Sequence, residues 1–167
     1  MINGRDLPSP YPPDPEAKIT WVKFLDDLHF KRHVKAIGIE AGREAEYVVS
    51  QDYRVQYTQE GDSRVREITV PEGMLTDFAS VPRMARWFAG RVGPHLEAAI
   101  VHDWLFVAWQ ELGIQPQRQH FRFANAIFAA LLKAAGVGWF KRMIMIRAVS
   151  GLIGWRVFRK PEDRRFA

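Results

Sequence analysis

The stretch Ala98–Gly113, AAIVHDWLFVAWQELG, places two polar side chains inside an otherwise apolar segment. His102 can accept and release a proton near neutral pH, and Asp103 can hold a cation. Burying either group without a partner is costly, so the segment predicts compensating groups nearby. Two interpretations stay open: a catalytic pair, or a histidine held by a hydrogen bond beside an aspartate at the rim of a core.

The spacing of the apolar residues predicts a helix with His102 on its core-facing side. At about 100° per residue, His102 shares a face with Ala98, Leu105 and Trp109, and Asp103 is turned towards the edge of that face. The short connection IQPQR then leads to a second helical segment, QHFRFANAIFAALLKAAG. Helices joined by so short a loop pack antiparallel, so this segment is expected to face His102.

The second segment supplies candidate partners for the pair. Arg118, Arg122 and Asn125 are spaced by four and three residues and therefore share one side of a helix. Asn125 is expected to accept the ring proton of His102, and one of the arginines to pair with Asp103.

A further acidic group precedes the helix predicted over residues 80–90. In TDFAS, Asp77 is either a capping residue or, with Asp103, a ligand for a divalent metal such as calcium, which prefers oxygen ligands. Ser80 is expected to cap the helix, with Pro82 in its first turn.

Four stretches resemble a family of phage and prophage proteins of unknown function: ITVPEGMLTDFASVPR, EAAIVHDWLF, RFANAIFAALLKAAGV and RAVSGLIGW. The resemblance covers about residues 47–155, and the family pattern TDFASVPR … HDWLY … AD draws attention to Ser80 and Arg83. It implies a phage-encoded gene near head and tail genes. Asn125 stands where the family has aspartate, and Phe106 where it has tyrosine.

The His-Asp helix is also similar, more weakly, to the catalytic helix pair of phospholipase A2 enzymes. That similarity implies His102 as general base, Asp103 as calcium ligand with carbonyls near Gly93, and Asn125 as the residue that orients the imidazole. The calcium loop motif and its cysteines are absent. Asparagine also lacks the charge that stabilises an imidazolium, so a member with Asn125 would be slow or inactive.

The surrounding pattern predicts an α+β fold, in which a small N-terminal antiparallel β-sheet is followed by a bundle of about four helices. Residues 1–17, which contain PSPYPPDP, are expected to form an extended arm that lies over a neighbouring subunit with Tyr11 as an exposed anchor, or else a disordered terminus. Residues 18–167 form one domain, with strands over about 18–72 and helices over about 78–160. The hairpin is expected at YRVQYT and RVREITV, and the last helix at residues 139–160.

Composition limits the protein class. The chain has 167 residues, 47% hydrophobic residues, no cysteine and a net charge of +5. It can bury a core, and disulfide scaffolds and cysteine-based zinc sites are excluded. We expect no signal peptide and no transmembrane helix, hence a location in a virion or in host cytoplasm.

The basic residues near the C-terminal end are expected to form a strip on one helix: Lys141, Arg142, Arg156, Arg159 and Lys160. They either snorkel from a largely buried helix or face nucleic acid, a phospholipid headgroup or an acidic subunit. Sequence-specific nucleic-acid binding is not expected, because recognition motifs are lacking.

Three functions are compatible with the sequence. The first is a phage virion or virion-assembly protein of the tail or head-to-tail region, whose Tyr11 and Trp21 dock on other phage structural proteins or on further copies. The second is a small metal-dependent hydrolase, phospholipase-like or directed at the cell envelope, with His102 as base. The third is an accessory protein acting on a host factor. An enzyme needs His102 to open onto a pocket, whereas a structural pair is sealed.

Overall fold

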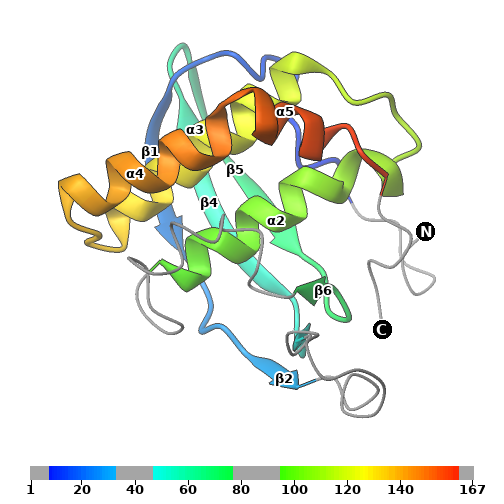
Figure 1. Cartoon of the computed structure of the whole chain (residues 1–167). Helices are drawn as coiled ribbons and strands as arrows, with labels where there is room; N and C mark the ends of the chain where they lie inside the picture. Colours follow the sequence, from blue (N-terminus) through cyan, green and yellow to red (C-terminus); the bar gives the residue numbers. More distant parts are fainter. Residues whose placement is uncertain (1–7, 33–46, 77–94, 162–167) are drawn as a thin grey trace.

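A computed structural model describes residues 8–32, 47–76 and 95–161 (Figure 1). Strands precede helices along the chain, so the predicted α+β class is confirmed. The elements are β1 (Ile19–Phe24), β2 (Phe30–Arg32), β3 (Tyr47–Val49), β4 (Tyr53–Gln59), β5 (Asp62–Val70), β6 (Leu75–Thr76), α2 (Leu96–Glu111), α3 (Arg118–Ala134), α4 (Trp139–Ser150) and α5 (Leu152–Phe158).

The strands form two antiparallel sheets, with the orders β1-β4-β5 and β2-β3-β6. The predicted hairpin is β4 and β5, and it turns at Gly61, whose φ of 80° suits glycine. Alternate side chains of β4 point into the core, so Tyr53, Val55 and Tyr57 are buried. Asp62 accepts hydrogen bonds from Arg64 and Arg66 at the start of β5, which lowers the pKa of its carboxyl to about 2.

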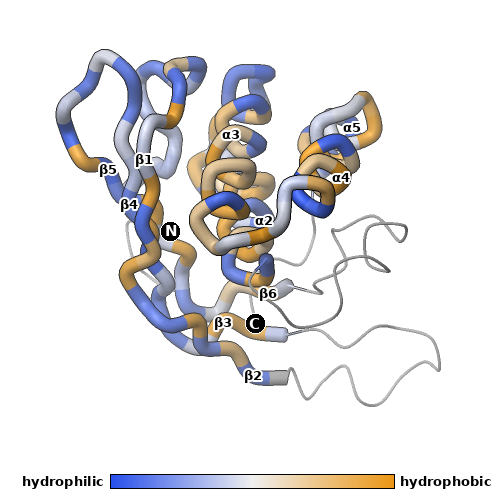
Figure 2. The backbone as a smooth tube through the Cα atoms, turned by 90° about the vertical axis from the view of Figure 1, so that its left-hand side faces the viewer, coloured by the Kyte–Doolittle hydropathy of each residue, from blue (hydrophilic) through white to orange (hydrophobic). Residues whose placement is uncertain are grey.

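The helices lie on one side of the larger sheet, in two layers. Figure 2 shows α2 and α3 next to β1, β4 and β5, with α4 and α5 on the far side of α3. The middle position of α2 explains why it is apolar nearly all round: its buried residues include Ile100 and Trp104 as well as His102. None of the described helices is long and apolar enough to cross a bilayer.

Glycines end two of the helices, at the last residue of the segments AAIVHDWLFVAWQELG and QHFRFANAIFAALLKAAG. Gly113 follows α2 with φ 64°, and Gly136 follows α3 with φ 73°. Both adopt the left-handed conformation that glycine allows after the last helical turn. The helix predicted over residues 80–90 lies outside the described residues.

The prediction of a single C-terminal helix over residues 139–160 is wrong. Gly151 has extended backbone (φ −81°, ψ −172°) and separates α4 from α5. The two helices meet closely, because a Cβ atom added at Gly154 would lie 1.8 Å from the carbonyl oxygen of Val149. The Ser150–Gly151 pair therefore breaks the helix, as such pairs commonly do.

The N-terminal arm packs on its own domain, which corrects the expectation that Tyr11 is exposed. The Tyr11 hydroxyl donates to the Leu105 carbonyl of α2 at 2.6 Å. Its ring stacks on His120 of α3 with centroids 4.2 Å apart. Only 8% of Tyr11 is exposed, whereas Trp21 is 44% exposed, as predicted for that residue.

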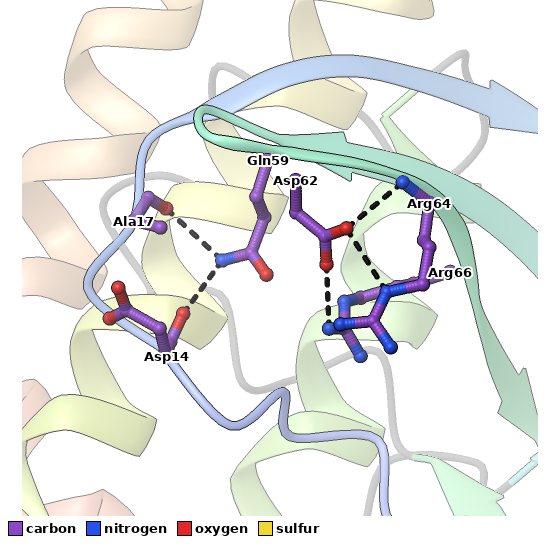
Figure 3. Close-up of polar contacts among 6 residues, drawn as sticks. All are labelled: Asp14, Ala17, Gln59, Asp62, Arg64 and Arg66. Carbon is purple, nitrogen blue, oxygen red and sulfur yellow. Dashed lines mark hydrogen bonds and ion pairs between the residues drawn. The ribbon is translucent and has the colours of Figure 1, made fainter.

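A buried glutamine ties the arm to the sheet. The Gln59 side-chain amide at the end of β4 donates to the carbonyls of Asp14 at 2.9 Å and Ala17 at 3.2 Å (Figure 3). These bonds satisfy backbone groups in a segment that has neither helix nor strand. Residues 8–17 are thus part of the domain's packing.

The Tyr11 contact predicts a measurable loss of stability. Tyr11→Phe removes one buried hydrogen bond and should lower the free energy of unfolding by about 1 kcal/mol. Tyr11→Ala also removes the ring and should cost about 3–5 kcal/mol. Urea denaturation measures both. Trp21→Ala is the control, since Trp21 is an exposed aromatic residue. An unchanged midpoint in Tyr11→Ala would contradict the buried position of Tyr11.

Candidate functional site

His102 and Asn125 meet between α2 and α3. His102 Nε2 donates to Asn125 Oδ1 at 3.0 Å, and both side chains are buried. The predicted hydrogen bond between these two residues is therefore confirmed. It follows from the antiparallel packing of the two helices, which places the core-facing side of each against the other.

Aromatic rings enclose the imidazole. The ring of His102 lies 4.1 Å from that of Phe106 and 4.6 Å from that of Phe128, measured between centroids. Burial disfavours the charged imidazolium and lowers the pKa of His102 to about 4, although the bond to Asn125 acts in the opposite direction. His102 is consequently neutral at pH 7. The ring of Phe106 offers it an apolar surface.

Asp103 is half-buried, as predicted for a residue at the edge of the core-facing side of α2. Its Oδ2 accepts a hydrogen bond from Thr76 Oγ1 of β6 at 3.0 Å. Thr76 was not among the residues identified from the sequence, although it is the first residue of the TDFASVPR motif. The bond joins the smaller sheet to α2 beside His102.

The prediction that Arg118 or Arg122 pairs with Asp103 is wrong. Arg122 pairs with Glu16 of the arm. Arg118 places its guanidinium 4.8 Å from the ring centre of Trp155 on α5. Both cations lie at the surface of α3, where the arm and α5 reach them, while Asp103 faces β6.

The metal site remains a prediction. Asp77, Ser80, Arg83 and Gly93 lie outside the described residues. Within the ranges that are described, three or more histidine or acidic side chains do not gather as a metal site would require.

The basic strip expected on one straight helix is interrupted. Lys141 and Arg142 belong to α4, whereas Arg156 is on α5 and both Arg159 and Lys160 follow it. The guanidinium of Arg159 lies 5.3 Å from the ring centre of Trp155, the same ring that Arg118 contacts. The expectation of a largely buried helix is also wrong, since several apolar residues of α4 and α5 are exposed.

The lowered pKa of His102 predicts loss of stability in acid. In the unfolded chain a histidine binds its proton near pH 6.5, but the folded His102 resists protonation until about pH 4. The unfolded state therefore gains protons first, and the free energy of unfolding falls from pH 6.5 to pH 4 by roughly 3 kcal/mol from this group. His102→Gln, which keeps a donor for Asn125, should flatten that part of the profile.

The matched control is His29→Gln, because His29 is exposed. Thermal or urea unfolding across this pH range measures the slopes. Equal slopes for the wild type and His102→Gln would show that the burial of His102 does not control the acid response.

The family comparison agrees with the extent of the resemblance seen in the sequence. A model described as "Protein of unknown function (DUF1353)" matches residues 47–149, which include β3 to β6 and α2 to most of α4. Curated proteins and solved structures give no match. His102, Asn125 and Thr76 all fall within the matched range. The chain therefore belongs to the DUF1353 family of proteins of unknown function.

Proposed function

We propose that the chain is an assembly protein of a phage particle, in the tail or head-to-tail region, and that His102 and Asn125 are a structural pair. The observation that carries the proposal is the enclosure of His102 between Phe106 and Phe128 with Asn125 on its Nε2. The phage origin in this proposal is supported by the TDFASVPR and HDWL motifs, which resemble those of phage and prophage proteins.

The environment of His102 suits structure better than catalysis. A general base works best when its pKa is close to the operating pH and when it reaches the reacting water. His102 has its pKa lowered to about 4 and is 4% exposed. Its neutral ring instead satisfies Asn125 inside the core and aligns α2 with α3, as buried hydrogen bonds do.

A groove beside Trp21 offers a place for a neighbouring subunit. It has a volume of about 780 Å³ and lies between the arm, β1 and α3. Its floor on α3 is made of small side chains, including Ala126, Ala129 and Ala130. β1 is an edge strand of its sheet, and such edges accept an extended segment of another chain. Trp21 is the type of residue that anchors protein interfaces.

Purified particles of the phage that encodes the chain test the proposal. Mass spectrometry of gradient-purified particles should detect the chain at a fixed copy number, and imaging should place it in the tail or neck. Ala130→Glu, which puts a charge in the groove, should reduce incorporation at least about tenfold without unfolding the protein. Val65→Glu on the exposed side of β5 is the matched control. Absence from wild-type particles would refute the proposed function.

Asn125→Asp separates a structural pair from a dormant enzyme. A carboxylate beside His102 favours the imidazolium and should raise the pKa of His102, which NMR titration of the ring protons measures. We expect no hydrolysis of short-chain phospholipids with added calcium by this variant. Calcium-dependent turnover that appears in Asn125→Asp and disappears in Asn125→Asp with His102→Gln would support the hydrolase instead.

A further inference from the structure

The C-terminal half of the helical region is cationic throughout. Between Glu111 and Glu162 the sequence has no Asp or Glu. The same stretch carries nine basic residues: Arg118, Arg122, Lys133, Lys141, Arg142, Arg147, Arg156, Arg159 and Lys160. Glu16 from the arm reaches Arg122, at the end of α3 remote from α4. The basic residues of α4 and α5 therefore have no carboxylate on their own helices to offset their charge.

The outward side of α5 is apolar, although its inward side already fills the core. Gly154 and Phe158 are buried against α2 and α3, where the Phe158 carbonyl accepts from Trp109 Nε1 at 3.0 Å. Leu152 and Ile153 are turned the other way and are 72% and 73% exposed. Val157, one turn further on, is 52% exposed. A helix at an ordinary water-facing surface carries polar groups at such positions.

The start of α4 adds aromatic side chains to this layer. Trp139 and Phe140 are 68% and 59% exposed. Arg147 is exposed on α4 and Arg156 on α5. Figure 2 shows that α4 and α5 form the layer farthest from the larger sheet. We call the following residues the outer helical face: Trp139, Phe140, Arg147, Leu152, Ile153, Arg156 and Val157.

We propose that the outer helical face binds the surface of a bilayer containing anionic lipids. Aliphatic side chains on short helices enter the boundary between headgroups and acyl chains, and tryptophan favours the same depth. Arg147 and Arg156 then meet lipid phosphates, which attract basic residues close to the surface. Because the longer of the two helices has 12 residues, this contact lies on the membrane and does not span it.

The combination of residue types distinguishes a lipid surface from nucleic acid. DNA phosphates bind arginine and lysine side chains, but exposed leucine, isoleucine and valine add little to such binding. An anionic bilayer binds both kinds of side chain, since its headgroups contact the basic residues and its acyl chains contact the apolar ones. The absence of carboxylates on α4 and α5 removes the repulsion that such a surface would otherwise meet.

Flotation of the full chain with vesicles tests the inference. We expect binding to vesicles of phosphatidylcholine and phosphatidylglycerol in roughly equal parts, and at least about tenfold weaker binding to phosphatidylcholine alone. The variant Leu152→Ser/Ile153→Gln/Val157→Gln should weaken binding to the mixed vesicles at least about tenfold. The variant Arg147→Gln/Arg156→Gln should weaken it about tenfold and reduce its dependence on salt.

Val65→Gln is the matched control, since Val65 is an exposed aliphatic residue on β5, away from this face. Circular dichroism and thermal unfolding verify that each variant is folded. Failure of the wild type to bind mixed vesicles overturns the inference, as does equal binding by the triple variant. Tight, salt-sensitive binding to duplex DNA that the triple variant retains, or dimerisation that only the triple variant loses, would assign the face to those partners instead.

Discussion

The hydrogen bond between His102 and Asn125 is the constraint on which the helical region depends. An imidazole enclosed by aromatic rings needs a partner for its N–H, and Asn125 provides it from the neighbouring helix. The bond joins the facing sides of α2 and α3 at one buried point, where it satisfies the polar atoms of both side chains.

Burial on all sides is the second property of α2. The larger sheet lies on one side and α5 on the other, while the arm closes the remaining gap through the Tyr11 hydroxyl and Leu105 carbonyl. At its edge, Asp103 accepts from Thr76 and so connects the smaller sheet to the same helix. A helix in this position has no polar face, so His102 and Asp103 near its middle must be satisfied from neighbouring elements.

The two surfaces proposed for partners differ in chemistry. The groove between β1 and α3 combines Trp21 and alanines of α3 with the charged residues Glu16, Lys18, Arg122 and Lys133, which suits an extended protein segment. The outer helical face presents exposed aliphatic and aromatic side chains among arginines, which suits a lipid surface. Because they lie on opposite sides of α3, one chain can use both.

Local patterns in the sequence were sufficient for the β4–β5 hairpin, the glycines that end α2 and α3, and the pairing of His102 with Asn125. These features depend on strand alternation, on left-handed glycine and on helical periodicity across a short loop, all of which act over a few residues. Local patterns did not predict the burial of Tyr11 or the partners of Asp103, Arg118 and Arg122. These contacts depend on elements that are distant in the chain, such as the 94 positions between Tyr11 and Leu105, and no local spacing encodes which of them meet. The break at Gly151 has a local cause in the Ser150–Gly151 pair, but the direction that α5 takes after it depends on packing against α2, where Trp109 donates to the Phe158 carbonyl.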